Sequence, residues 1–331
     1  MPPAPGWGAA HKPGAVPLRP LGLGDIYGAA FKIIRVNPSA TVGSAVLVAA
    51  VSMLLPVLAT AALALFTDFT LLDPATIDTA NPDNVTTNAE IFAALTPLML
   101  LSVGSLLSAF GLIFVTGMVT HVTAAAAVGR RVGLGEAWAA THGRRWRLVG
   151  LSLTLALMWS LVIGIYLLMV TAALLGGGDV GTVVAVVLIG LLVSVPVWFF
   201  LWIRVSYLAV PPLMLERVGV FGAIGRGWQL TRRQFWRTFG IALLTVLVTG
   251  IASNVLGFPL GLIGGAISAA VPDPQTAVLV SVAVQALASV LSSAFTAPFT
   301  SAVTCLQYVD QRIRKEAYDM ELLAQAGVLA R

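Results

Sequence analysis

Residues 182–203 read TVVAVVLIGLLVSVPVWFFLWI, a run of 22 residues without one charged side chain. An α-helix of this length is about 33 Å long at 1.5 Å per residue, enough to cross the hydrocarbon core of a bilayer. The whole chain has the same character, because 58% of its 331 residues are hydrophobic and only 10% are charged. Soluble globular proteins are about one-quarter charged. The composition therefore excludes a soluble protein and predicts an all-α, polytopic integral membrane protein.

Six apolar segments of this kind alternate with polar connections, and each predicts one membrane-spanning helix. They lie near 39–66, 91–118, 148–175, 182–210, 239–270 and 277–306. Residues 1–20 hold six proline and three glycine residues and no apolar core of a signal peptide, which predicts a disordered tail. We therefore expect a six-helix membrane domain over 21–311, followed by a basic cytoplasmic tail over 312–331.

The charges are divided between the two ends of the predicted spans. The short connections at 67–90, 176–181 and 271–276 contain no lysine or arginine but carry seven acidic residues. All nineteen basic residues lie on the other side, mostly in the connections at 129–147 and 215–238 and in the two terminal segments. Because cytoplasmic loops are enriched in lysine and arginine, both termini are predicted to be cytoplasmic. The composition, rich in arginine and alanine, indicates a bacterial plasma-membrane protein.

A repeated element precedes the first, third and fifth spans. Residues 21–43 (LGLGDIYGAAFKIIRVNPSATVG) align without a gap with residues 218–240 (VGVFGAIGRGWQLTRRQFWRTFG), sharing three glycines, an arginine and a threonine. A third copy, which is four residues shorter, lies at 132–150. The chain is thus predicted to consist of three tandem units that start near 21, 132 and 218, each an interfacial helix followed by a hairpin of two spans.

The repeated element has the pattern of an amphipathic helix. Phe221, Trp228 and Phe235 share one helical face, whereas arginines occupy another. Such a helix lies in the headgroup plane, where anionic lipid attracts each surface arginine by about 1 kcal/mol. These helices either anchor the spans or bind a specific lipid headgroup or membrane-protein partner; nucleic-acid binding is not expected, because the basic residues are dispersed along span-flanking positions. The candidate contacts are Arg35, Arg145, Arg147, Arg204, Arg226, Trp228, Arg232, Arg233, Trp236 and Arg237.

Arg204 is the basic residue that lies closest to the interior of a predicted span. The 22 residues before it already suffice to cross the membrane, so its side chain is expected at the cytoplasmic interface. There it either pairs with a residue such as Glu216 or contacts a headgroup or substrate. No aspartate or glutamate falls inside a predicted span, which counts against a proton- or ion-coupled pump.

The fifth segment carries an asparagine and three regularly spaced glycines. Asn254 is followed by Gly257, Gly261 and Gly265, a spacing that puts the glycines on one helical face, where a neighbouring helix can approach closely. Pro259 lies between them, so the segment either packs tightly as one helix or breaks to line a cavity, as in some transporters.

The sequence contains none of the motifs that would indicate catalysis. It has no nucleophile elbow, no phosphate-binding loop, no zinc-protease motif and no clustered carboxylates. Its one cysteine, Cys305, cannot form an internal disulfide, and its three histidines are too scattered for a metal site. We therefore expect no enzyme activity, no cofactor and no metal.

Three stretches together resemble the glycerophosphoryl diester phosphodiesterase membrane-domain family of actinobacterial membrane proteins. They are PLRPLGLGDIYGAAFKIIRVNP (17–38), YLAVPPLMLERVGVFGAIGRGWQLTRRQFWRTFGI (207–241) and YVDQRIRKEAYDMELL (308–323), and the resemblance covers roughly 17–323. Some members carry a soluble phosphodiesterase barrel, whose His-Arg and Glu-Asn motifs are missing here. The resemblance therefore implies an accessory membrane domain without catalytic residues.

Three functions are compatible with these features. The first is a non-catalytic scaffold or lipid- or partner-binding membrane domain that uses its cytoplasmic interfacial helices. The second is a transporter or permease for a lipid-like or small amphipathic solute, and the third is a membrane enzyme of lipid metabolism. A scaffold predicts a dry, tightly packed bundle, whereas a continuous polar cavity that reaches Asn254 or Arg204 favours transport.

Overall fold

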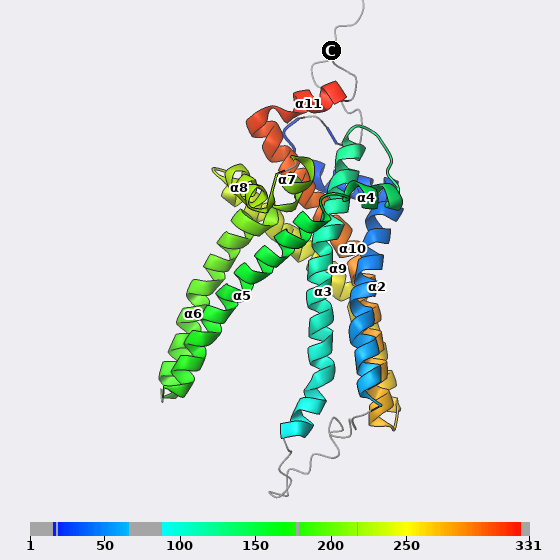
Figure 1. Ribbon diagram of the computed structural model, residues 1–331, viewed down its shortest axis with the longest axis vertical. Helices are drawn as coiled ribbons and strands as arrows, with labels where there is room; N and C mark the ends of the chain where they lie inside the picture. Colours follow the sequence, from blue (N-terminus) through cyan, green and yellow to red (C-terminus); the bar gives the residue numbers. More distant parts are fainter. Residues whose placement is uncertain (1–15, 18, 66–87, 177–178, 217, 326–331) are drawn as a thin grey trace, which may run out of the picture.

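Every regular element in the described part of the chain is a helix (Figure 1). The computed structural model describes residues 16, 17, 19–65, 88–176, 179–216 and 218–325. The long helices are α2 (Pro38–Leu63), α3 (Asn88–Ala127), α5 (Arg145–Leu175), α6 (Val180–Leu201), α9 (Phe235–Ala270) and α10 (Pro274–Glu316). The shorter ones are α1 (Leu23–Val36), α4 (Leu134–Ala140), the π-helical turn Trp202–Tyr207, α7 (Val210–Leu215), α8 (Val220–Thr231) and α11 (Tyr318–Gln325).

Six of the described helices are long and apolar enough to cross a membrane, and they follow the six predicted segments in order. The chain thus has the helices of a multi-pass membrane protein. The last of them is longer than expected, because α10 continues to Glu316 through residues assigned above to the tail. Ion pairs one helical turn apart, Arg312 with Glu316 and Arg314 with Asp310, each 2.9 Å long, support this extension. Of residues 1–20, predicted to form a disordered tail, 1–15 and 18 lie outside the described residues, and among the others Val16 is buried.

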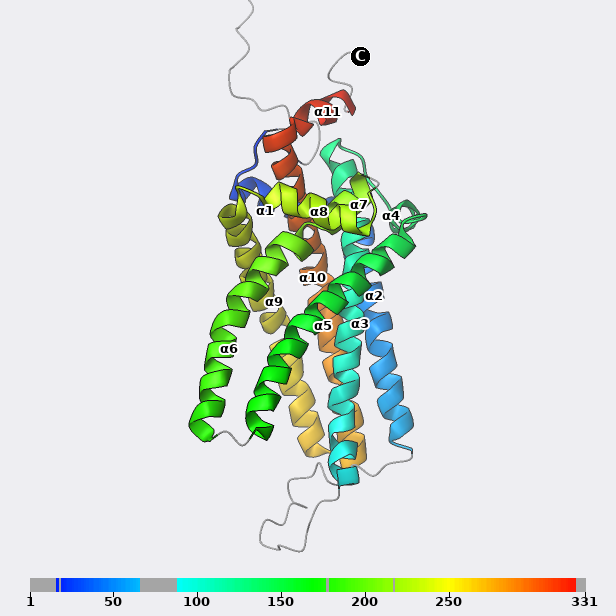
Figure 2. The ribbon, with the colours of Figure 1, turned by 60° about the vertical axis from the view of Figure 1, so that its left-hand side comes forward.

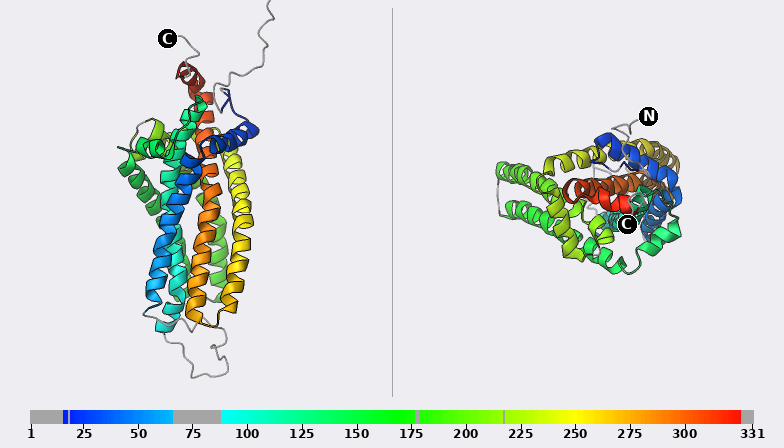
Figure 3. Two further views of the ribbon diagram at one scale, coloured as in Figure 1. Left: turned by 90° about the vertical axis from the view of Figure 1, so that its right-hand side faces the viewer. Right: turned by 90° about the horizontal axis from the view of Figure 1, so that it is seen from above.

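The long helices run up and down, and the short helices lie at one end of the bundle (Figure 2). The chain reverses between α5 and α6, and again between α9 and α10, at the opposite end. Helices α1, α4 and α8, which precede α2, α5 and α9, lie across the bundle axis, and α11 is at the same end (Figure 3). We call this the short-helix end. It gathers the repeated elements that lie far apart in the sequence.

The large buried side chains are concentrated at the short-helix end. Ile26 and Ile33 of α1 are buried against α3 and against Phe299 of α10. Away from that end, α10 packs against α2, α3 and α9, and small residues such as Ala45 and Ala49 form the buried faces. Small side chains let membrane helices approach closely without a large core.

Helices α5 and α6 form a hairpin that diverges from the other four long helices with distance from the short-helix end (Figures 1 and 3). No residue of α6 is buried. The large apolar side chains of the hairpin are exposed, for example Leu157 at 73% and Leu192 at 74%. An apolar hairpin exposed on almost all sides is suited to lipid and not to water.

Both described reversals start the next helix with the same cap. Asp179 accepts a hydrogen bond from the backbone N–H of Thr182 at 3.2 Å, and Asp273 accepts one from Thr276 at 2.8 Å. In each case the hydrogen bond from the threonine hydroxyl is the main cause that lowers the pKa of the aspartate. A carboxylate at this position satisfies a free amide of the first helical turn.

Replacing Asp273 with alanine is expected to speed amide hydrogen exchange at Thr276, because that N–H loses its acceptor. Acidification should likewise lower the protection of the Thr276 N–H, measured relative to its intrinsic exchange rate at each pH. The pKa of this carboxylate is lower in the folded protein than its value of about 4 in the unfolded chain. The cap therefore stabilises the helix end fully at pH values above the unfolded pKa, and this stabilisation is lost as the pH falls through the folded pKa. Exchange at Thr182 is the internal control for the substitution. Unchanged exchange at Thr276 would contradict the cap.

Candidate functional site

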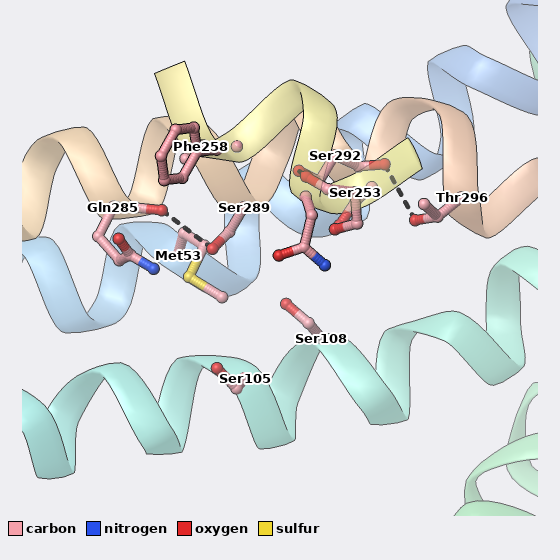
Figure 4. Close-up of a pocket in the computed structure, with 13 residues that line it drawn as sticks. Met53, Ser105, Ser108, Ser253, Phe258, Gln285, Ser289, Ser292 and Thr296 are labelled. Atoms are coloured by element: carbon pink, nitrogen blue, oxygen red, sulfur yellow. Dashed lines mark hydrogen bonds between the residues drawn. The ribbon is translucent and has the colours of Figure 1, made fainter. Parts of the chain in front are cut away.

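A polar cavity of about 410 Å³ lies between α3, α9 and α10 (Figure 4). Helices α3 and α9 both pack on α10, and Ser105 and Ser108 of α3 face Ser253 of α9 and Ser289 of α10 across the space. The lining consists of Met53, Ser105, Ser108, Ser253, Asn254, Gly257, Phe258, Gln285, Ala288, Ser289, Ser292, Ser293 and Thr296. None of these side chains is ionisable, so the cavity combines hydrogen-bonding groups with zero charge.

A second cavity, of about 370 Å³, extends the first toward the short-helix end. The two share Ser105, Ser108, Ser293 and Thr296, and the second continues past Thr300. Together we call them the polar groove. From Gln285 to Thr300 it follows α10 for fifteen residues, or about 22 Å at 1.5 Å per residue.

The polar groove lies deep within the length of the bundle. Met53, which lines the first cavity, is fifteen residues from the start of α2 at Pro38 and ten from its end at Leu63. These separations correspond to about 22 Å and 15 Å along the helix axis. Hydrogen-bonding groups at such depth in an apolar helix bundle are costly unless they have hydrogen-bond partners.

Several hydroxyl groups of the polar groove donate to their own helix. Ser289 donates to the carbonyl of Gln285 at 2.9 Å, and the amide of Asn254 donates to the carbonyl of Gly250 at 2.8 Å. A serine or threonine bonded in this way still has its oxygen lone pairs. The polar groove therefore offers acceptors to a ligand that donates hydrogen bonds.

Ser108 differs from the other hydroxyl residues of the polar groove. Its Oγ is buried and has no hydrogen-bond partner among the described residues, and the residue lines both cavities. A buried hydroxyl without a partner loses the hydrogen bonds it makes in water, at a cost of about 1–3 kcal/mol. Ser108 is thus available both as a donor and as an acceptor at the centre of the polar groove.

In the structure, Asn254 and Gly257 line the polar groove. The close contact between α9 and a neighbouring helix is not at all three glycines that the sequence predicted. Helix α9 is continuous through Pro259, so the alternative of a broken helix is wrong. A Cβ built on Gly261 or Gly265 would have no neighbour within 4 Å, whereas one on Gly264 would lie 2.7 Å from Val284. The tight packing of α9 on α10 therefore involves Gly264, which lies seven residues after Gly257 and so on the same helical face, and it does not involve Gly261 or Gly265.

Arg204 lies in the π-helical turn that follows α6 and packs on aromatic rings. Its guanidinium is 5.2 Å from the ring centre of Trp228 and 5.5 Å from that of Phe235, within the range of cation–π attraction. It also donates to the carbonyl oxygen of Trp228 at 3.4 Å. Glu216, the partner suggested by the sequence, pairs with Arg226 instead.

Arg226 connects α8 to two carboxylates, Glu216 directly after α7 and Glu316 at the end of α10. Its guanidinium lies 2.5 Å from Glu216 and 2.6 Å from Glu316, and the hydrogen bond with Glu216 is the main cause that raises its pKa above the ordinary arginine value. Tyr308 donates to the other oxygen of Glu216 at 2.5 Å. Two acidic partners leave this arginine little charge to offer a lipid.

Arg237 takes part in a second ion-pair cluster, which the sequence analysis missed. The carboxylate of Asp310 is fully buried and accepts hydrogen bonds from Arg237, from Arg314 and from the backbone N–H of Leu21. Both arginines also donate to the carbonyl oxygen of Leu21. A buried aspartate with three donors ties the start of the described chain to α9 and α10.

The remaining predicted contacts lie apart from one another on the short-helix end. Arg145 stacks on Trp138, 4.2 Å from the ring centre. The side chains of Arg35, Arg147, Arg232 and Arg233 are exposed on α1, α5 and the α8–α9 connection, as are the rings of Trp228 (41%) and Trp236 (78%). The ten predicted residues thus do not form one binding site.

Compared with protein-family models, curated proteins and solved structures, the chain matches none of them. No group of three histidine, cysteine, aspartate or glutamate side chains in the described ranges could hold a metal ion. Functional inference therefore depends on the chemistry of the polar groove and of the short-helix end.

Proposed function

We propose that this chain is a non-catalytic, multi-pass membrane protein that binds a small, lipid-like amphipathic solute in the polar groove and moves it through the bilayer. The observation that carries the proposal is the cavity lined by serines, Gln285 and Thr296 that reaches Asn254, midway along the spans, and continues into a second, mostly apolar cavity. A scaffold needs only packed helices. Side chains with unused hydrogen-bond donors or acceptors at this depth are expected instead in a protein that binds a polar headgroup there.

The chemistry of the polar groove favours a neutral headgroup. A charged headgroup would need an opposite charge at this depth, because an unpaired ion in an apolar medium is strongly disfavoured. The lining offers hydroxyl and amide groups only, and Phe258, exposed at 66%, lies beside them. This combination suits a hydroxyl-bearing headgroup inside the groove and an apolar chain directed toward lipid.

The orientation we propose puts the short-helix end in the cytoplasm of a bacterial cell. The support is the charge distribution, since no lysine or arginine lies in the three connections at the other end. In this arrangement the chain is three tandem units of an interfacial helix and a hairpin, and it belongs with the membrane-domain family that it resembles in sequence.

A scaffold or lipid-binding surface is the second candidate, and one observation favours it. Trp146 and Trp236 occupy aligned positions of the repeated element and are both largely exposed, at 86% and 78%. Exposed tryptophans beside arginines are typical of a membrane interface. This surface serves docking on anionic lipid or on a membrane-protein partner, and it does not require the polar groove.

Filling the polar groove should block solute movement. With the purified protein in liposomes, we expect faster transbilayer movement of a fluorescent short-chain glucosyl diacylglycerol, whose neutral sugar headgroup is costly to desolvate, than in protein-free liposomes. Replacing Ser108 with leucine should slow this movement by about tenfold or more, because the larger side chain occupies the centre of both cavities. Dithionite quenching of the outer-leaflet fluorophore measures the rate.

Ser160 provides the matched control. It lies on the exposed side of α5 and donates to its own helix at Ala156, so its replacement with leucine should leave the rate unchanged. If wild-type liposomes move the probe no faster than protein-free ones, transport of this class of solute is wrong and the scaffold function is favoured.

A further inference from the structure

A third cavity, of about 480 Å³, lies at the short-helix end where the segment before α1 meets α9 and α10. Residues 20–23 form one side of it, Trp236 and Leu244 lie on α9, and Arg314 comes from α10. None of the residues of the polar groove contributes to it. It is therefore a separate site, and we call it the arginine pocket.

Two guanidinium groups line the arginine pocket and are held by the same acceptors. Arg237 and Arg314 each donate to Asp310 and each donate to the carbonyl oxygen of Leu21, at 2.6 Å and 3.2 Å for the carbonyl. Asp310 is fully buried beneath them. Shared acceptors fix both side chains, so little conformational entropy is lost when a ligand binds.

The charges around the arginine pocket do not balance. Asp310 neutralises one of the two guanidinium groups, and Arg19 and Asp25, on either side of the lining residues 20–23, form a pair of their own at 3.5 Å. A guanidinium carries five N–H donors, and the four hydrogen bonds described above use two from each arginine. The arginine side chains remain 31% and 29% exposed. One positive charge and several donors are therefore available to an anion.

The surroundings of the arginine pocket match those of a phospholipid headgroup at the membrane surface. Trp236 is the second residue of the apolar helix α9 and is 78% exposed, the position and exposure of an interfacial tryptophan. Leu244 and Leu23 extend the lining on the apolar side. A phosphate between the two arginines would leave its glycerol beside Trp236 and its acyl chains along α9.

We propose that the arginine pocket binds the phosphate of an anionic glycerophospholipid, with Arg237 and Arg314 as donors and Trp236 in contact with the glycerol. Arginine pairs bind phosphate oxygens with strong, directed hydrogen bonds. An ion pair that served only to hold the chain together would need one arginine for Asp310. A bound anion would neutralise the charge of the second arginine, which explains why two arginines are present.

The experiment is a titration of the delipidated, full-length protein with phosphatidylglycerol, followed by native mass spectrometry. Replacing Arg314 with glutamine keeps the Arg237–Asp310 pair and should weaken binding by roughly tenfold, since one charge-assisted contact to phosphate is lost. Replacing Trp236 with alanine leaves all ion pairs in place and should weaken binding by roughly threefold. Diacylglycerol, which lacks phosphate, is the reference ligand, and any binding of it elsewhere on the protein should be equal in wild type, Arg314→Gln and Trp236→Ala.

The matched control changes the aligned residues of another repeat. Trp146→Ala with Arg147→Gln removes an equally exposed tryptophan and its neighbouring arginine from α5, outside the arginine pocket, and should leave binding unchanged. Millimolar glycerol 3-phosphate, added as a competitor, distinguishes a lipid phosphate from a soluble one. If it does not displace phosphatidylglycerol, the ligand is a lipid. If it does, the arginine pocket binds the same phosphate group on a soluble compound. Equal phosphatidylglycerol binding by wild type, Arg314→Gln and Trp236→Ala would overturn the proposal, whatever the outcome for the polar groove.

Discussion

Replacing Asp310 with alanine is expected to lower the free energy of unfolding by about 3–5 kcal/mol, the usual penalty for removing one partner from a buried ion pair. The loss has two causes. Arg237 and Arg314 would keep two positive charges side by side without their carboxylate, and the N–H of Leu21 would lose its acceptor. Reversible unfolding in mixed micelles with increasing SDS measures the change.

The exposed pair between Arg19 and Asp25 is the control for this prediction. Its side chains are 58% and 30% exposed and 3.5 Å apart, and exposed pairs contribute about 0–1 kcal/mol. Arg19→Gln should therefore leave the unfolding midpoint nearly unchanged. If Asp310→Ala is as mild as Arg19→Gln, the buried carboxylate does not connect the N-terminal segment to the bundle in the manner described.

Replacing Gly111 with alanine should destabilise the protein by about 1–3 kcal/mol through overpacking between α2 and α3. A Cβ at this position would overlap a Cγ methyl group of Val48. Valine has one strongly preferred rotamer in a helix, so it cannot turn away without further cost. The same unfolding assay in mixed micelles measures the effect.

A second substitution should reverse the first. Val48→Ala removes the overlapping methyl group, so the double variant with Gly111→Ala should be more stable than Gly111→Ala alone, and a double-mutant cycle should give a favourable coupling energy. Gly164→Ala is the control, since nothing lies within 4 Å of a Cβ there and alanine is the better helix former. Additive effects at Val48 and Gly111 would contradict the contact.

The six long helices could be predicted from the sequence because their signal is local. A run such as 182–203 is apolar over its whole length, and no distant contact is needed to recognise it. The ends of the helices were less predictable. The extension of α10 to Glu316 depends on polar residues one turn apart, which resemble a solvated tail when the sequence is considered alone.

The polar groove was only partly predictable, because each of its hydroxyl residues is ordinary by itself. The signal that was available is the spacing of Gln285, Ser289, Ser292 and Thr296, which puts four polar side chains on one face of an apolar helix. Whether such a face meets a neighbouring helix or a cavity depends on tertiary packing. The glycines of α9 illustrate the same point, since the spacing at 257, 261 and 265 drifts around the helix, whereas the contact with α10 follows the face of Gly257 and Gly264.

The role of the arginines could not be predicted for a different reason. Membrane topology alone accounts for arginines near the ends of spans. The sequence around such an arginine therefore does not indicate whether it also pairs with a particular carboxylate. Arg237 and Asp310 are 73 residues apart, and Arg226 and Glu316 are 90 apart. Only the folded chain brings these pairs together.

The contact between Leu21 and Asp310 also sets an order for biosynthesis. The two residues are separated by 289 positions, and a ribosome adding about 5–20 residues per second needs roughly 15–60 s to cover that distance. During this time the first spans are synthesised, and they exist before the carboxylate that secures the segment preceding them. Completion of the last helix is therefore the event that closes the fold, and newly made chains that stop before Asp310 would be open substrates for membrane quality-control proteases.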